Sequence, residues 1–347
     1  MMNKRIIRRI ALALLLLLPL ATYLLLFPPY QPLRPTGAHA IATARYAYTD
    51  KKRLEQFSSR RENRQVNVTF WYPQNTDGNA SYPLIVYSHG GLGAETSNES
   101  LFLELASHGY VVASIGHPYH ALWTRNQDGR ITFVDSEYFQ ELGRENARQD
   151  KQQSYRYYQK WMRVRTDDIN LVIDTILEKS SNNADDVYRL IDVKRIGVMG
   201  HSLGGSAALA MPRQRNDVSA VIALEAPFLY DIVGVENDKF TWRDAAYPVP
   251  VLNVYSDSSW SHLDEWTQYA RNAALRDDAS ETAISLHLSG AGHFSLTDLS
   301  LASPLLTTLL ENGQSNHDRT GYLQKVNRAC LDFFNRHIKN QTIKEQP

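Results

Sequence analysis

Cysteine is almost absent from this sequence: Cys330 is the single one among 347 residues. One thiol allows no disulfide within the chain and no cysteine-ligated metal cluster. Neither sign of charge is in excess, because 37 basic side chains balance 37 acidic ones. This balance gives no reason to expect nucleic acid as a partner. We also find no internal repeat, and the length fits one large α/β domain with appendages.

The amino terminus carries a long apolar run. Basic side chains occur four times within residues 1–9, and residues 10–27 are almost wholly apolar and uncharged. Counted from Ile6, the run is just long enough to cross a bilayer as a helix. We therefore predict a membrane anchor over residues 1–30, with its transmembrane segment at 6–27. The basic flank places the rest of the chain in the periplasm or outside the cell; the alternative is a cleaved signal sequence and a secreted protein.

The rest of the sequence predicts an α/β fold. Short apolar strands alternate with helical patterns, for example the strand at 84–87 and the helical stripe from Ile169 to Leu177. This alternation indicates a mostly parallel central sheet flanked by helices. We place the domain at residues 46–340, behind a linker at 31–45. Within it, residues 116–158 are expected to be irregular and to form a lid or pocket insertion.

Residues 200–204 (Gly-His-Ser-Leu-Gly) match the G-x-S-x-G pattern of a nucleophile elbow. An apolar strand precedes them and an alanine-rich helix follows, which is the context that the motif requires. A serine on such a sharp turn needs glycine neighbours, because side chains at −2 and +2 would come too close. Ser202 is therefore the candidate nucleophile.

A serine nucleophile needs a base and an acid that orients the base. The candidate base is His293, in a glycine-rich loop just past the last strand. Two carboxylates could be the acid, since each follows a strand that lies between Ser202 and His293 in the chain. We favour Asp257, after the strand at 249–255, and keep Glu225, one strand earlier, as the alternative.

An oxyanion hole needs two backbone N–H groups. Leu203 follows the nucleophile directly and should supply one of them. The other should come from the loop after the strand ending at Tyr87, which runs His-Gly-Gly-Leu-Gly over residues 89–93. Either Gly91 or Leu92 could be that donor, because spacing alone does not separate them.

Three segments together resemble the plasma-type platelet-activating factor acetylhydrolases and related bacterial esterases of the α/β-hydrolase superfamily. They are residues 82–94, 105–113 and 200–205. The resemblance implies an α/β-hydrolase fold without a metal, with Ser202 as nucleophile, Leu203 and Leu92 as oxyanion donors and His293 as base. It also places the family's aspartate at Glu225, 23 residues after Ser202, so the acid stays open.

We expect a membrane-anchored serine hydrolase that cleaves carboxylic esters, short-chain or of phospholipid type, with no cofactor and no metal. Aromatic residues of the insertion and beyond could line the acyl site: Trp123, Phe133, Tyr138, Phe139 and Trp242. Two alternatives remain, amide or thioester acyl transfer by the same triad, and a catalytically silent binding protein. Cys330 lies in the closing helix, not at the elbow, which excludes a cysteine nucleophile. The oligomeric state is left open.

Overall fold

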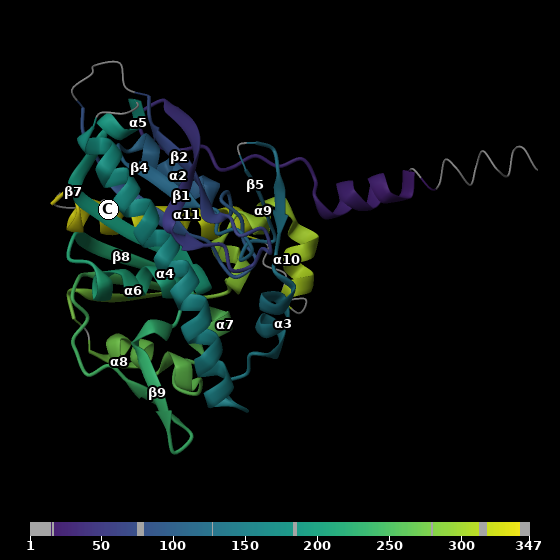
Figure 1. Cartoon of the computed structure of the whole chain (residues 1–347), viewed down its shortest axis with the longest axis vertical. Helices are drawn as coiled ribbons and strands as arrows, with labels where there is room; N and C mark the ends of the chain where they lie inside the picture. The colour runs from purple at the N-terminus through teal and green to yellow at the C-terminus, as the bar shows by residue number, and fades with distance from the viewer. Residues whose placement is uncertain are drawn as a thin grey trace, which may run out of the picture.

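An eight-stranded sheet forms the centre of the protein (Figure 1). The computed structural model describes residues 15, 17–74, 80–126, 128–182, 186–278, 280–311 and 318–340. In spatial order the strands are β1 (Ile41–Leu54), β2 (Asn63–Pro73), β4 (Val111–Ile115), β3 (Tyr82–Ser88), β7 (Ile191–His201), β8 (Val218–Leu224), β11 (Val251–Ser256) and β12 (Ala283–Leu288). β2 is antiparallel to β1 and to β4, and every other neighbouring pair in this sheet is parallel. The predicted mostly parallel sheet is confirmed.

Helices cover both faces of the sheet. One face packs against α2 (Glu99–Ser107) and α11 (Arg319–His337), and the other against α4 (Lys151–Ser181) and α6 (Leu203–Gln214). Side chains of β3 alternate between them: Ile85 packs with the first pair and Val86 with the second. Both are fully buried, as expected of a strand covered on both sides.

Shorter elements complete the domain. Two hairpins pair β5 (Trp123–Arg125) with β6 (Ile131–Phe133) and β9 (Ile232–Glu236) with β10 (Lys239–Trp242). The remaining helices are α3 (Ser136–Arg144), α5 (Asp186–Arg189), α7 (Asp257–Trp260), α8 (Ala270–Asp277), α9 (Leu299–Ala302) and α10 (Pro304–Leu310), and the 3₁₀ turns are η1 (Leu229–Asp231), η2 (Thr267–Tyr269) and η3 (His293–Leu296).

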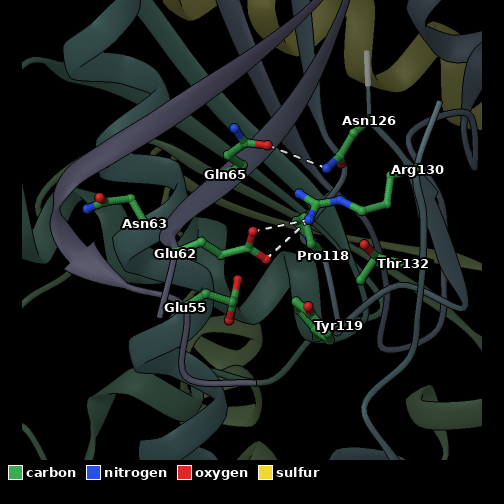
Figure 2. A pocket seen from close by; sticks show the side chains of 9 residues that line it. All are labelled: Glu55, Glu62, Asn63, Gln65, Pro118, Tyr119, Asn126, Arg130 and Thr132. Atoms are coloured by element: carbon green, nitrogen blue, oxygen red, sulfur yellow. Dashed lines mark hydrogen bonds and ion pairs between the residues drawn. The ribbon is translucent and has the colours of Figure 1, made fainter. Parts of the chain in front are cut away.

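The insertion expected to be irregular at 116–158 is more ordered than the sequence indicated. It contains the β5–β6 hairpin, α3 and the first two turns of α4. The hairpin is attached to the sheet: Arg130 pairs with Glu62 at 3.1 Å, and Asn126 donates to Gln65 at 3.4 Å (Figure 2). The sequence pattern did not predict that α4 begins at Lys151, because polar residues and tyrosines there interrupt the apolar stripe.

The single cysteine is buried within the closing helix. Cys330 has no exposed surface and packs in α11 against the sheet. Burial raises the pKa of its thiol above the usual range. The structure therefore agrees with a packing role for this side chain.

The predicted membrane segment is only partly described, because residues 1–14 and 16 lie outside the described part of the chain. Residues 17–26 form a helix that extends away from the domain beside α9 and α10 (Figure 1). At its end the Ser303 hydroxyl donates to the Leu26 carbonyl. Among the described residues, no helix is long and apolar enough to cross a membrane.

The segment expected to be a linker at 31–45 is attached to the domain. β1 begins within it, at Ile41. Upstream, two backbone N–H groups bind side chains of α2: Leu33 donates to the Ser100 hydroxyl at 2.8 Å, and Thr36 donates to the Glu104 carboxylate at 2.8 Å. The chain is therefore part of the fold from about residue 33.

Candidate active site

Ser202 lies on a strained turn between β7 and α6. Its φ and ψ are 53° and −126°, a conformation that non-glycine residues rarely adopt. The Ser202 N–H donates to the carbonyl of Leu224 at the end of β8, at 2.8 Å. A β-carbon on Gly204 would lie 2.0 Å from the Ser88 carbonyl oxygen, and one on Gly200 would lie 2.4 Å from Gly204. The turn therefore needs both glycines, as the motif predicts.

The loop after β3 lies directly against Ser202. A β-carbon on Gly90 would be 3.4 Å from the β-carbon of Ser202. The N–H groups of Gly91, Leu92 and Leu203 donate to no acceptor within the described residues. Backbone donors without acceptors beside a strained serine are what an oxyanion hole requires. The three N–H groups therefore stay candidate oxyanion donors, and the structure places the loop after β3 against the elbow.

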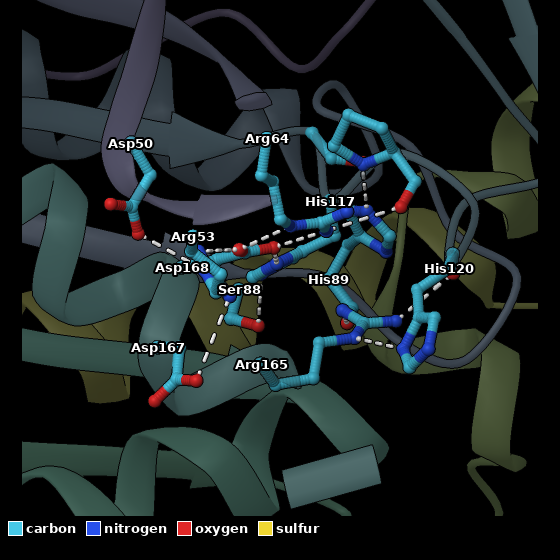
Figure 3. Close-up of polar contacts among 12 residues, drawn as sticks. Asp50, Arg53, Arg64, Ser88, His89, His117, His120, Arg165, Asp167 and Asp168 are labelled. Carbon is cyan, nitrogen blue, oxygen red and sulfur yellow. Dashed lines mark hydrogen bonds and ion pairs between the residues drawn. The ribbon is translucent and has the colours of Figure 1, made fainter. Parts of the chain in front are cut away.

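This loop rests on a fully buried arginine of α4 (Figure 3). Arg165 donates to the carbonyls of His89 at 2.8 Å, Gly90 at 3.1 Å and His120 at 3.0 Å. No carboxylate hydrogen-bonds to its guanidinium within the described chain. Burial lowers the pKa of Arg165 below its usual value. Arg165 thus fixes the course of the loop through its carbonyl groups.

A buried ionic cluster joins α4 to strands β1 and β2 (Figure 3). The carboxylate of Asp168 accepts from Arg64 at 2.6 Å and from Arg53 at 2.7 Å, and it lies 3.0 Å from His117 Nδ1. The other nitrogen of His117 lies 2.9 Å from the Ser88 hydroxyl. Burial lowers the pKa of His117 to about 3, so the ring is neutral at pH 7. The cluster connects α4 with the end of β3.

Nothing in the sequence analysis identified this cluster. Arg165 and Asp168 stand one helical turn apart, between the apolar residues Met162 and Ile169. These two charged residues among apolar ones were the available sign of a buried ionic cluster, because charges on a buried helix face need partners. The partners of the His117 ring are Asp168 and Ser88, and no group of three potential metal ligands occurs among the described residues.

His293 lies beside the elbow. Its ring centroid is 4.6 Å from that of His201, and its carbonyl oxygen is 3.1 Å from His201 Nε2. The residue is partly exposed, but the protein encloses its ring closely enough that burial lowers the pKa to about 4. Within the described chain, neither ring nitrogen hydrogen-bonds to Ser202 or to either candidate acid. Catalytic hydrogen bonds are often loose without substrate.

Asp257 lies next to His293 but binds a different histidine. Its carboxylate accepts from His287 at 2.7 Å and from the N–H of Gly290 at 2.8 Å. The side chain is 46% exposed. Its backbone N–H donates to the Ala291 carbonyl at 2.9 Å, close to the base. Both oxygens of Asp257 are therefore already used by partners other than His293.

Glu225 occupies a more unusual position at the end of β8. Its φ is 54°, its side chain is buried, and it directly follows Leu224, whose carbonyl binds the Ser202 N–H. Oε2 accepts from the N–H of Ser256, whereas Oε1 has no hydrogen-bond partner among the described residues. Burial raises the pKa of Glu225 to about 7, against the opposing effect of the hydrogen bond from Ser256. A buried, strained carboxylate with a free oxygen is typical of functional positions.

Comparison with known proteins decides the family. The sequence profile of "Platelet-activating factor acetylhydrolase, isoform II" matches residues 56–346. The chain belongs to this family. The match extends over the whole sheet from β2 onward and includes every candidate residue, from the loop after β3 to His293.

Members of the platelet-activating factor acetylhydrolase family and other hydrolases are among the relatives. Platelet-activating factor acetylhydrolase of Canis lupus familiaris is 33% identical over 280 residues, 74% of this chain and 57% of that protein. Cutinase est2 of Thermobifida alba is 26% identical over 226 residues, 65% of this chain and 56% of the relative. The chain thus spans little more than half the length of these relatives.

A solved structure confirms the fold. A ferulic acid esterase from Streptomyces cinnamoneus superposes with a TM-score of 0.63, over 90% of this chain and 95% of that protein, at 20% identity. Together with the sheet order and the elbow, this identifies the α/β-hydrolase architecture that the sequence predicted.

Proposed function

We propose that this chain hydrolyses carboxylic esters with Ser202 as nucleophile. The observation that carries the proposal is the strained Ser202 backbone, with the unpaired N–H groups of Leu203 and the loop after β3 beside it. The names of the relatives, an acetylhydrolase, a cutinase and an esterase, support the same reaction. The family match covers all the residues involved.

The reaction follows from the roles of these groups. His293 takes the proton of the Ser202 hydroxyl while Oγ forms a bond to the acyl carbon, and the carbonyl electron pair moves to the oxygen. The N–H groups of Leu203 and Leu92 bind that oxyanion. The intermediate collapses, the C–O bond to the alcohol breaks, and His293 returns the proton to the alcohol. Water, deprotonated by His293, then releases the acid from Ser202.

For the third member of the triad we propose Glu225, in place of the Asp257 that we favoured from the sequence. Support comes from the burial of Glu225, its free Oε1 and its position next to the strand residue that binds the Ser202 N–H. The partners of Asp257, by contrast, are His287 and Gly290. The family resemblance also places its acid at position 225.

Paired substitutions test this assignment. Glu225→Gln should lower kcat by about 10⁴-fold, as loss of a triad acid does, whereas Asp257→Asn should stay within a few-fold of wild type. Both replacements keep the shape of the side chain and remove its charge. The reverse pattern would restore Asp257 as the acid.

Hydrolysis of p-nitrophenyl esters of increasing acyl length tests the activity itself. The full chain should turn over at least one of these esters, and Ser202→Ala should abolish it. The dependence on acyl length separates an acetyl-sized pocket from one for longer, phospholipid-type chains. Faster turnover of matched amides or thioesters would favour the first alternative. Absence of turnover, combined with no labelling of Ser202 by a fluorophosphonate, would favour a silent binding protein.

For location we propose anchoring through residues 6–27, with the domain in the periplasm or outside the cell and secretion after cleavage as the alternative. The apolar, uncharged run and its basic flank support anchoring. Amino-terminal sequencing of the mature protein, together with carbonate extraction of membranes, tests it. A mature chain starting near Ala40 would show that the segment is cleaved.

A further inference from the structure

The loop that carries the second oxyanion donor is enclosed from two sides. A β-carbon on Gly90 would lie 3.4 Å from that of Ser202, whereas one on Gly91 would lie 3.4 Å from the hydroxyl oxygen of Tyr138. Tyr138 belongs to α3, within the insertion that follows β4. The loop therefore lies between the nucleophile and this helix.

The hydroxyl of Tyr138 hydrogen-bonds to the peptide group between Gly91 and Leu92. Tyr138 Oη donates to the carbonyl of Gly91 at 2.8 Å. No cis peptide occurs in the described chain, and a trans peptide directs its C=O and N–H to opposite sides. Because the Gly91 carbonyl points to α3, the N–H of the same peptide, which belongs to Leu92, points away from α3.

Tyr138 itself has little freedom to move. It is fully buried, it stacks on His120 with ring centroids 3.8 Å apart and 2° between the planes, and its edge contacts Trp161. Burial raises the pKa of its hydroxyl, so the group remains a protonated donor. A hydrogen bond to the carbonyl also polarises the peptide and strengthens its N–H as a donor.

We propose that Tyr138 is a positioning residue of the oxyanion hole, whose hydroxyl fixes the Gly91–Leu92 peptide so that the Leu92 N–H faces the oxyanion formed on Ser202. The proposal rests on the proposed ester hydrolysis and deepens it, because it selects Leu92 over Gly91 as the second donor. The Gly91 N–H belongs to a different peptide, whose Gly90 carbonyl is held by Arg165 instead.

Tyr138→Phe in the full chain tests this directly, because it removes one hydroxyl and keeps the ring. Removal of an oxyanion donor itself costs about 10²–10³-fold, so a donor left in place but released from its anchor should cost less. We expect kcat for a p-nitrophenyl ester to fall about tenfold with KM unchanged. The inhibition constant of a trifluoromethyl ketone, whose adduct with Ser202 carries an oxyanion, should rise by the same factor.

The matched control is Tyr110→Phe. Tyr110 is equally buried and donates to Asn335, but it lies at the amino end of β4, opposite the strand ends that carry the site. Fluorophosphonate titration counts the active sites in each preparation, so that a merely unfolded fraction is not mistaken for slower chemistry. If the phenylalanine variant folds poorly, Tyr138→Met provides a second side chain without a donor.

Equal kcat and equal ketone affinity in wild type and Tyr138→Phe would overturn the proposal, and the choice between Gly91 and Leu92 would then no longer rest on Tyr138. A rise in KM alone would show that Tyr138 shapes the substrate pocket rather than the hole. Failure of the proposed function looks different: the wild-type chain would then hydrolyse none of the esters.

Discussion

At the scale of single residues, the burial of Glu225 opposes the ionised state that its proposed catalytic role requires. Folding places its side chain among protein atoms, which disfavours the charged form and raises its pKa from 4.5 to about 7. An ionised glutamate is nonetheless what a histidine base requires as its partner. The burial of this carboxylate therefore makes the folded chain less stable once the group ionises.

This cost predicts how stability changes with pH. A raised folded-state pKa gives stability that is present below the unfolded value, near 4.5, and is lost as pH rises through about 7. The difference corresponds to about 3 kcal/mol at most. Between pH 5 and pH 8, the free energy of unfolding of wild type should therefore fall relative to that of Glu225→Gln, measured by urea titration. Parallel curves for the two proteins would contradict the assigned ionisation.

The position of the residues in the sequence did not separate the two candidate acids, and only the family resemblance pointed to position 225. Glu225 and Asp257 follow neighbouring strands, β8 and β11, and strand ends alone do not show where a side chain points. The observations that favour Glu225 in our proposal, His287 on Asp257 and an unpaired oxygen on Glu225, depend on three-dimensional packing. By contrast, glycine spacing was sufficient to predict the turn at Ser202.

At the scale of elements, the ionic cluster around Asp168 attaches α4 to the sheet edge. Its partners Arg53 and Arg64 come from β1 and β2, and His117 comes from the segment after β4. Asp168 stands near the middle of α4, just before the apolar stripe that begins at Ile169, and the helix continues upstream of it with Trp161 and Met162 buried in the core.

Removing one charge from the cluster should lower the free energy of unfolding substantially. Asp168→Asn leaves Arg64 buried with only Glu55 as an acidic partner, and breaking a buried ion pair typically costs about 3–5 kcal/mol. Its neighbour Asp167 is 44% exposed and lies 3.7 Å from Arg53. Asp167→Asn should therefore cost less than about 1 kcal/mol. Chemical denaturation of the two variants measures the contrast, and similar losses would show that the cluster contributes no special stability.

At the scale of the whole molecule, the amino-terminal segment combines two parts with different roles. The helix at 17–26 extends away from the domain, whereas the chain from about residue 33 binds α2. The predicted division at residue 45 followed composition, and composition does not show that Gly37 and His39 donate to Ser107 of α2. The mostly parallel central sheet, in contrast, followed from the alternation of strands and helices.

Two truncations distinguish these parts. A protein lacking residues 1–27 should keep the melting temperature and the ester turnover of the full chain. A protein lacking residues 1–40 loses the hydrogen bonds to α2 and should melt several degrees lower, because each such bond contributes about 1 kcal/mol. Calorimetry on both proteins measures the difference. Equal melting temperatures would show that the contacts of residues 33–39 add no stability.

The position of Cys330 in the closing helix α11 determines when a reagent can reach its thiol. Cys330 is the only thiol of the chain and lies fully buried in α11. A thiol reagent can modify it only when α11 separates from the sheet, so each modified molecule records one opening event. The labelling rate at low denaturant thus follows the opening of the carboxyl-terminal helix, and at high denaturant it follows global unfolding. Cys330 is therefore a natural probe for the rates of these opening motions, and no engineered label is required.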